Sequence, residues 1–290
     1  MMEDSNTGDI AGVCGIETQV GLEQPFYNYR VSTVVHASQE LGVWTRMSAL
    51  NISHDLTGYA EVCSLFLSPR YRTGGVGGLL SRSRFMFIAQ FRDRFPERLC
   101  SGTARPLDED GTSPSWRAVG SHFYQIDFNA ADYLSSHGRK SFLAGADAAL
   151  SGVRRTRCPQ DAQDACRPHA SRHGPPPAKM LEAEGLRYQN HVDIFDAGPV
   201  LECHINDLRT VRESVVVPAA IGVPNAGDDA QDAHATKSLV SNTSLADFRV
   251  GVAPGIVANG SFVLSADDAA ALRVNAGDPV RVLPLKAKQG

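Results

Sequence analysis

The chain has 290 residues, of which 42% are hydrophobic and 21% charged, and its formal net charge is −4. These values are typical of a globular protein with one large or two smaller domains, and the acidic balance argues against a general nucleic-acid binder. No apolar run reaches the ~18–20 residues of a membrane span, and the N-terminus lacks a signal-peptide pattern, so a cytoplasmic protein without membrane contact is expected. The six cysteines are scattered without a Cys-x-x-Cys pair, which predicts reduced thiols and no metal site.

Strand and helix patterns alternate in the first half of the chain, which predicts an α/β fold. A turn at Ser5–Gly8 precedes the first of three segments with strand pattern, and the third is the most apolar, as in a central strand. These segments are Ile10–Val20, Tyr29–Ser38 and Ala60–Pro69. A helix follows, with a loosely spaced apolar face of Leu79, Leu80, Ser83, Phe87 and Phe91.

Ser113 and Pro114 are typical of a helix start, so a short helix is predicted to about Gly120, followed by a strand over residues 122–128. From Ala144 to Pro177 large apolar residues are almost absent and neither period is present, which predicts a loop or a disordered segment.

Regular patterns return after this segment. A helix is expected from Ala178 to Gly185 and strands within Asn190–Ile205. A polar linker, Val223–Ser238, precedes a tail in which strand patterns alternate with turns around a helix near Asp267–Leu272. The tail therefore predicts a small β-rich subdomain.

A glycine cluster lies between the third strand and its helix, where unpaired backbone N–H groups and the helix dipole favour an anion. A Walker loop needs Gly-Lys-Ser/Thr, which is absent, and a Rossmann fingerprint fails because Leu80 takes the place of its third glycine. The spacing Arg72-Thr73-Gly74-Gly75-Val76-Gly77 instead resembles the Arg/Gln-x-x-Gly-x-Gly/Ala pyrophosphate loop of acyl-CoA N-acyltransferases of the GCN-related superfamily. The alternative is a glycine-rich surface turn.

The wider sequence resembles the arginine N-succinyltransferase family. The segments "FYNYRVSTVVHASQELGV", "LFLSPRYRTGGVGGLLSRSRFMFIAQFRDRF", "SPSWRAVGSHFYQIDF" and "MLEAEGLRYQNHVDIFDAGPVLECHINDLR" carry this resemblance, which covers nearly everything outside Ala144–Pro177. The resemblance implies a fold of two acyltransferase-like halves, mixed sheets flanked by helices, with a small β-rich C-terminal subdomain. The implied organisation is a CoA-binding half at 1–142, an aberrant segment at 143–177, the rest of the second half at 178–225, a linker at 226–247 and the subdomain at 248–290.

The implied reaction transfers the succinyl group of succinyl-CoA to the α-amino group of L-arginine, in arginine catabolism. Succinyl-CoA is then a co-substrate, no cofactor is bound permanently, and a homo-oligomer or a hetero-oligomer with a related subunit is expected. The resemblance places CoA contacts at Leu65, Arg72, Thr73, Gly74, Gly75, Val76, Gly77 and Gly78. Arg70 can add positive charge, while Arg82 and Arg84 are expected to be solvated helix residues.

The sequence departs from the family at the catalytic histidine, which belongs to a His-Pro-x-Thr-Ala-Pro motif just before the "MLEAEG" helix. Counting back from Met180 places Ser171 at that position, with His169 and His173 nearby but outside the motif. Back-translation of Asp164–Pro175 with a one-nucleotide shift can restore the motif, so two compensating frameshifts around residues 145–177 are hypothesised. The family also has a strand and helices ahead of the point where Met1 stands, so this chain is expected to be truncated, and poorly folded or inactive.

Two further interpretations stay open: a succinyltransferase for ornithine or another amino acid, and a non-catalytic acyl-CoA-binding or partner subunit. Carboxylates are needed to recognise an arginine side chain. The candidates, each more easily explained as a structural acid, are Glu61, Asp127, Asp193 and Asp196. His36, His122 and Cys63 are likewise more easily explained as structural residues than as catalysts.

Overall fold

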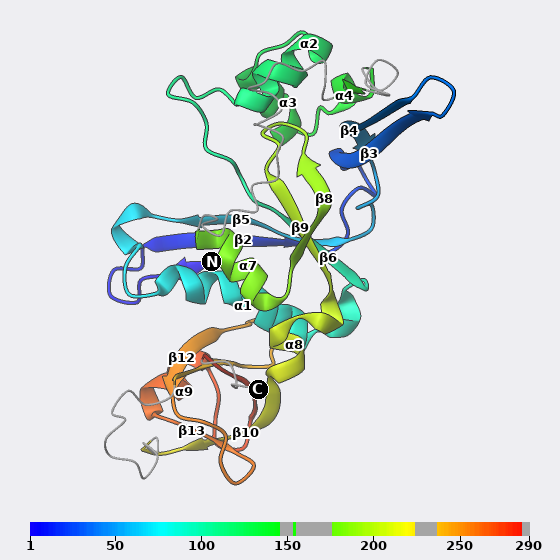
Figure 1. Cartoon of the computed structure of the whole chain (residues 1–290). Coiled ribbons are helices and arrows are strands. Elements are labelled where there is room, and N and C mark those ends of the chain that lie inside the picture. Colours follow the sequence, from blue (N-terminus) through cyan, green and yellow to red (C-terminus); the bar gives the residue numbers. More distant parts are fainter. Residues whose placement is uncertain (146–152, 155–175, 224–236, 286–290) are drawn as a thin grey trace. The chain divides into compact units, whose positions relative to one another are not determined.

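The computed structural model describes residues 1–145, 153–154, 176–223 and 237–285 (Figure 1). The chain forms two compact units, each made of discontinuous segments. Unit 1 contains residues 1–16, 62–97 and 204–290, and unit 2 contains residues 17–61 and 98–203.

In unit 1 the strands β1 (Met2–Glu3), β2 (Ile10–Glu17) and β5 (Ala60–Leu67) are neighbours in that order. The short helix η1 (Pro69–Tyr71) and the helix α1 (Val76–Gln90) follow β5. The turn, the first strand and the apolar third strand are therefore where the sequence predicts them.

Helix α1 is buried on two sides, which explains its loose period. Phe85, Met86 and Ile88 are fully buried, and on another side the ring of Phe87 lies 5.1 Å from that of Phe248 in the C-terminal part of the same unit. The buried residues of α1 include the polar Ser81 and Arg84, so they do not form the single apolar stripe that a helical period reveals.

The C-terminal part of unit 1 is a five-stranded sheet with the order β12-β11-β14-β10-β13. Its elements are β10 (Val215–Ile221), β11 (Lys237–Ser241), β12 (Val250–Pro254), β13 (Phe262–Leu264), α9 (Ala266–Leu272) and β14 (Pro279–Pro284). Two short helices, η5 (Ile205–Asp207) and α8 (Arg209–Glu213), precede it, and η2 (Arg92–Arg94) follows α1. The predicted β-rich tail is thus present, but β11 lies in the segment expected to be linker. It is an inner strand of this sheet, and its residues from Ser238 to Ser241 are buried on both faces.

Unit 2 is built on strands ordered β6-β9-β8-β3-β4-β7. They are β3 (Asn28–Ser38), β4 (Val43–Ser53), β6 (Arg98–Gly102), β7 (Val153–Arg154), β8 (Arg187–Asp193) and β9 (Pro199–His204). The helices are α2 (Ser121–Tyr124), α3 (Phe128–Ser136), α4 (Ser141–Gly145) and α7 (Pro176–Glu184). The start of β5 belongs to this unit, where Ala60 and Glu61 pair in parallel with Leu99 and Cys100 of β6.

The segment 122–128 is not the predicted strand. The helix that begins at Pro114 continues through a π-helical turn, Trp116–Gly120, to Tyr124, and α3 starts at Phe128. The indole of Trp116 stacks on Tyr124 at a centroid distance of 5.2 Å, and its Nε1 donates to the carbonyl of Ile126 at 3.1 Å. The prediction was wrong because the aromatic residues follow a helical spacing into this core, which overrides their β-propensity.

Candidate active site

The glycine cluster lies in a loop between a strand and the start of a helix, as the sequence predicts. Strand β5 ends at Leu67, η1 turns the chain, and Gly75 caps the N-terminus of α1. Gly74 and Gly75 have φ angles of +62° and +80°, a region that side chains disfavour, and a Cβ at either position would meet no atom within 4 Å. The loop backbone is therefore bare on its outer side and can accept close approach by a ligand.

The loop is also electrostatically suited to an anion. The first turn of α1 contains no acidic residue, and its leading N–H groups add the positive end of the helix dipole. Arg72, Thr73, Gly74 and Gly75 are exposed, whereas the following residues of the turn are half-buried. The Nε of Arg72 donates to the carbonyl of Leu67 at 2.9 Å, which fixes its guanidinium beside the loop.

Contacts on both sides hold this loop in place. At its start, in η1, Arg70 pairs with Asp9 at 2.9 Å, and the hydroxyl of Tyr71 donates to Asp4 at 3.0 Å. Arg70 is therefore engaged with the turn between β1 and β2 and is not a free cation.

On the inner side Arg84 joins α1 to β5. Arg84 as a whole is 4% exposed, and its guanidinium donates to the carbonyl of Cys63 at 3.1 Å and to the hydroxyl of Ser81 at 3.0 Å. The expectation of a solvated Arg84 was wrong, because the helix period alone does not show that α1 is covered on this face. Burial lowers the pKa of the Arg84 guanidinium.

Strand β5 is irregular next to the loop. Ser64 has a φ angle of +51°, and the ladder with β6 covers only Ala60 and Glu61 in the register that the structure describes. Leu65, the expected CoA contact, is half-buried on this irregular part of the strand, and its neighbours Ser64 and Phe66 are exposed. Leu65 and the loop residues therefore lie on one continuous strand, loop and helix.

Three of the four candidate carboxylates have structural roles. Asp127 caps α3 by accepting from the backbone N–H of Ala130 at 2.8 Å. Asp193 accepts from the N–H of Phe195 at 2.7 Å, and Asp196 accepts from the N–H of Arg105 at 2.8 Å. Burial, and then the neighbouring Asp196 carboxylate, raises the pKa of Asp193.

Glu61, the fourth candidate, has an altered protonation equilibrium. Burial, with smaller effects from the charges of Glu17 and Asp193, raises the pKa of Glu61 from 4.5 to about 7. Lys140 opposes this shift. Glu61 thus holds its proton through a pH range in which an ordinary glutamate is ionised.

Replacing Glu61 with glutamine is expected to stabilise the protein above neutral pH. The pKa of Glu61 is higher in the folded than in the unfolded protein. The wild-type protein is therefore most stable below pH 4.5 and loses stability as the pH rises to about 7. The glutamine does not titrate in this range, so the advantage of the variant in unfolding free energy grows to about 3 kcal/mol by pH 7. Urea unfolding at acidic and alkaline pH measures this difference, with the exposed Glu23→Gln as control; an advantage independent of pH would contradict the assignment.

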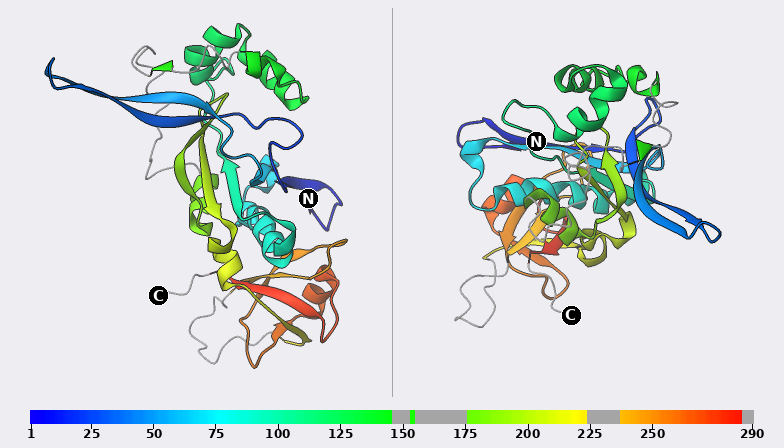
Figure 2. Two further views of the ribbon diagram at one scale, coloured as in Figure 1. Left: turned by 90° about the vertical axis from the view of Figure 1, so that its right-hand side faces the viewer. Right: turned by 45° about the horizontal axis from the view of Figure 1, so that its top comes forward.

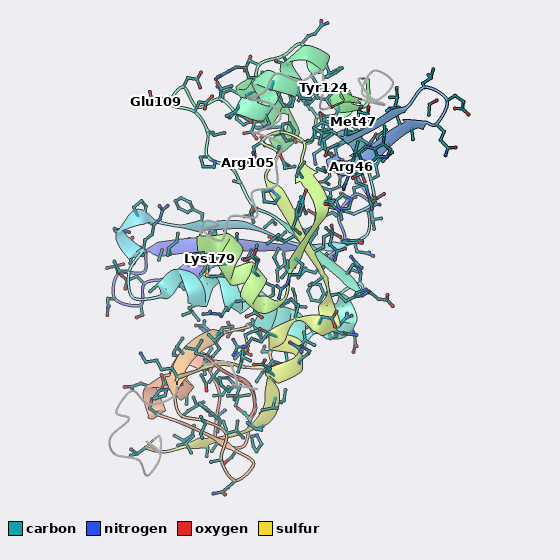
Figure 3. All side chains as sticks on the ribbon, in the orientation of Figure 1. Arg46, Met47, Arg105, Glu109, Tyr124 and Lys179 are labelled. Atoms are coloured by element: carbon teal, nitrogen blue, oxygen red, sulfur yellow. The ribbon has the colours of Figure 1, made fainter. Side chains whose placement is uncertain are left out.

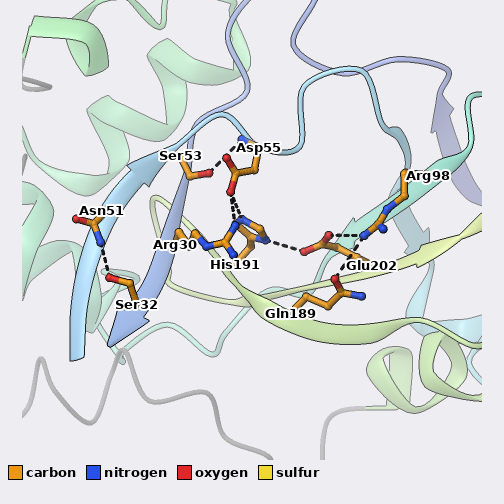
Figure 4. Close-up of polar contacts among 9 residues, drawn as sticks. All are labelled: Arg30, Ser32, Asn51, Ser53, Asp55, Arg98, Gln189, His191 and Glu202. Atoms are coloured by element: carbon orange, nitrogen blue, oxygen red, sulfur yellow. Dashed lines mark hydrogen bonds and ion pairs between the residues drawn. The ribbon is translucent and has the colours of Figure 1, made fainter. Parts of the chain in front are cut away.

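Sequence reasoning missed a buried polar network in unit 2 (Figure 4). His191 of β8 and Glu202 of β9 are 4% and 2% exposed, and Nδ1 of His191 lies 2.7 Å from Oε1 of Glu202. Arg98 of β6 donates to the other oxygen of Glu202 at 3.3 Å. These residues come from three strands that are separate in sequence, so no local spacing could have shown them.

The network reaches the surface through Asp55. Its Oδ2 lies 3.3 Å from Nε2 of His191 and accepts a hydrogen bond from Arg30 of β3. The hydrogen bond with Glu202 raises the pKa of His191 above its usual 6.5, and the hydrogen bond from Arg30 lowers the pKa of Asp55. Both ring nitrogens of His191 are thus hydrogen-bonded, and the residue links β8 to β9 and to the loop after β4.

The remaining histidine and cysteine candidates do not form a catalytic cluster in the described residues. His36 is exposed on β3, and Cys63 is half-buried on β5. Ser171, His169 and His173 lie outside the described residues, so the position of the catalytic histidine is not tested by the structure. Among the described residues no group of acidic, histidine or cysteine side chains could hold a metal ion, and no helix is long and apolar enough to cross a membrane.

Two protein-family models match this chain. Residues 1–210 match the model described as "Arginine N-succinyltransferase beta subunit", and residues 223–284 match the model of its C-terminal domain. The chain belongs to the arginine N-succinyltransferase family. The mixed α/β fold and the acyltransferase class predicted from the sequence are thereby confirmed.

Individual relatives agree with the family models. Arginine N-succinyltransferases from Escherichia coli (strain 55989) and Shigella flexneri are each 42% identical over 289 residues, which is 100% of this chain and 82% of theirs. The solved structure of arginine/ornithine succinyltransferase subunit AI from Pseudomonas aeruginosa is 31% identical, with a TM-score of 0.82 over 98% of this chain and 80% of that one. The loop that the sequence singled out thus lies within a succinyltransferase-family match.

Proposed function

We propose that this chain transfers the succinyl group of succinyl-CoA to the α-amino group of L-arginine, giving N2-succinyl-L-arginine and CoA. The observation that carries the proposal is the bare, positively polarised loop Arg72–Gly78 within the region that matches the family. Succinyl-CoA is a co-substrate in this proposal, and no cofactor remains bound between turnovers. The protein is proposed to act in the cytoplasm.

The loop is proposed to bind the pyrophosphate of CoA. The contacting residues are Arg72, Thr73, Gly74, Gly75, Val76, Gly77 and Gly78. Backbone N–H groups at the start of α1 supply hydrogen bonds, and the guanidinium of Arg72, fixed by the Leu67 carbonyl, adds charge. Leu65 is proposed to contact CoA as well. It lies on the irregular part of β5, beyond Glu61, where β5 is no longer paired with β6.

The chemistry requires a base as well as a CoA site. The acceptor ammonium loses a proton, the free amine attacks the thioester carbonyl, the C–S bond breaks, and CoA leaves as its thiol after accepting a proton. The family supplies a histidine where this chain has Ser171, with His169 and His173 as the nearest imidazoles. A chain with this sequence is therefore proposed to bind succinyl-CoA but to transfer its acyl group slowly.

A second acceptor is worth a direct comparison, because the solved relative is named for both arginine and ornithine. Mass spectrometry of reactions with succinyl-CoA and equal amounts of the two amino acids tests the proposal. Succinylated arginine as the main product supports it. Succinylated ornithine as the main product would mean that ornithine, and not arginine, is the acceptor. CoA binding without either product would favour a non-catalytic acyl-CoA-binding or partner subunit.

A further inference from the structure

Strands β3 and β4 form a long hairpin that extends beyond the rest of unit 2 (Figure 2). Their antiparallel register is continuous from Asn28 opposite Ser53 to Ser38 opposite Val43. The turn is well formed, since the Ser38 hydroxyl donates to Glu40 at 3.0 Å and accepts from the N–H of Leu41 at 3.2 Å. The distal part, residues 31–48, is called the arm below.

The arm exposes large apolar side chains on both faces. Val35 and Trp44 are 50% and 67% exposed on one face, and Val43 is 49% exposed on the other. Leu41 at the turn is 77% exposed. An isolated two-stranded hairpin is at best marginally stable in water, so an arm of this composition calls for a further strand or surface beside it.

Strand β3 has an open edge along the arm. Its register with β8 ends where Arg30 faces His191. Beyond that point a bulge in β8 and the φ angle of +70° at Asn190 turn β8 away from β3. Within the part of the chain that the structure describes, no strand is paired with residues 31–38 on this side.

The sequence of this edge contains none of the residues that normally prevent strand pairing. Residues 31–38, "VSTVVHAS", contain no proline, lysine, arginine or acidic residue. Soluble proteins protect exposed edges with such residues, with bulges or with a covering segment. The other edge of the arm is different, because β4 carries the charged Arg46 there (labelled in Figure 3). Next to the arm, β4 pairs with β7 at Ala49 and Leu50.

We propose that two copies of this chain associate through β3, along the open edge formed by residues 31–38. The strands pair antiparallel about a twofold axis, which gives a four-stranded sheet with the order β4-β3-β3-β4. An edge of unpaired N–H and C=O groups selects an extended strand as partner, and an identical strand satisfies a twofold contact that closes at two copies. Pairing through β3 brings no like charges together, whereas pairing through β4 would bring the two Arg46 side chains close to each other.

The mass of the protein in solution, measured by sedimentation velocity, tests this association. The wild-type chain is expected at twice 31.2 kDa. Val35→Lys is expected to weaken the dimer at least about tenfold, because each copy adds a charge beside the twofold axis. Val215→Lys is the control, since Val215 is an equally exposed strand valine (47%) in unit 1, and this variant should remain dimeric.

Hydrogen exchange of the wild-type chain gives an independent test that needs no substitution. Amides of residues 31–38 are expected to become more protected as protein concentration rises, whereas amides elsewhere on the surface stay unchanged. A wild-type monomer, a dimer that Val35→Lys leaves intact, or protection that appears only on addition of a different subunit would each overturn the proposal. Circular dichroism of each variant verifies that it is folded.

Discussion

Replacing Gly75 with alanine is expected to weaken succinyl-CoA binding by about 100-fold, equivalent to about 2.7 kcal/mol. Two effects add. The φ angle of +80° makes any side chain strained by about 1–2 kcal/mol, so the loop shifts away from its binding geometry. The new methyl group also occupies the open outer side of the helix N-terminus, where phosphate oxygens must approach the backbone.

Gly260→Ala is the matched control for this prediction. Gly260 has a φ angle of +75°, and an added methyl group would likewise meet no atom within 4 Å, but this glycine lies in a turn of the C-terminal sheet. The control should lose about 1 kcal/mol of stability and keep its affinity for succinyl-CoA. Calorimetric titration of both variants decides: equal affinities would show that the loop does not hold the pyrophosphate.

Replacing Glu202 with leucine is expected to destabilise the protein by about 3 kcal/mol, because His191 and Arg98 lose the buried carboxylate that compensates their charges. The loss depends on pH. The pKa of His191 is raised in the folded state, so the stability it contributes is present below pH 6.5 and disappears as pH rises through the folded value. The difference between wild type and variant should therefore shrink with rising pH, down to the part due to Arg98.

Chemical denaturation over a pH series measures this difference. Glu213→Leu is the control, since Glu213 makes an i,i+4 pair with Arg209 at 2.8 Å but is 30% exposed, and its loss should cost under about 0.5 kcal/mol. If Glu202→Leu and Glu213→Leu cost the same, the buried network does not contribute to stability as argued.

The strand, loop and helix around the glycine cluster could be predicted from the sequence because their signals are local. An apolar strand, a run of glycines with fixed spacing and a helix start lie within residues 60–90, and each depends on conformational preferences of neighbouring residues. Long-range features could not be predicted in this way. Arg84 shows the limit: the helical pattern places it on α1, but only the packing around α1 decides that it is buried.

Strand β4 and the network around His191 were missed for related reasons. Both faces of the arm are exposed, so β4 lacks the alternation of buried and exposed residues that marks a strand. The network joins β3, β6, β8, β9 and the residues after β4, and sequence spacing carries no information about such a juxtaposition. The segment 122–128 was misassigned because its aromatic residues favour a strand in isolation and pack as a helix around Trp116.

The measurement that tests the central claim most directly is the rate of N2-succinyl-L-arginine formation by two proteins. One is the chain with the present sequence, and the other has residues 145–177 replaced by the shifted translation that restores the His-Pro-x-Thr-Ala-Pro motif. We expect both to bind succinyl-CoA, and the restored protein to form the product at least about 100-fold faster, since general acid–base catalysis typically contributes that much. Absence of product from both proteins would contradict the proposed function, and equal rates would contradict the role proposed for the histidine of the restored motif.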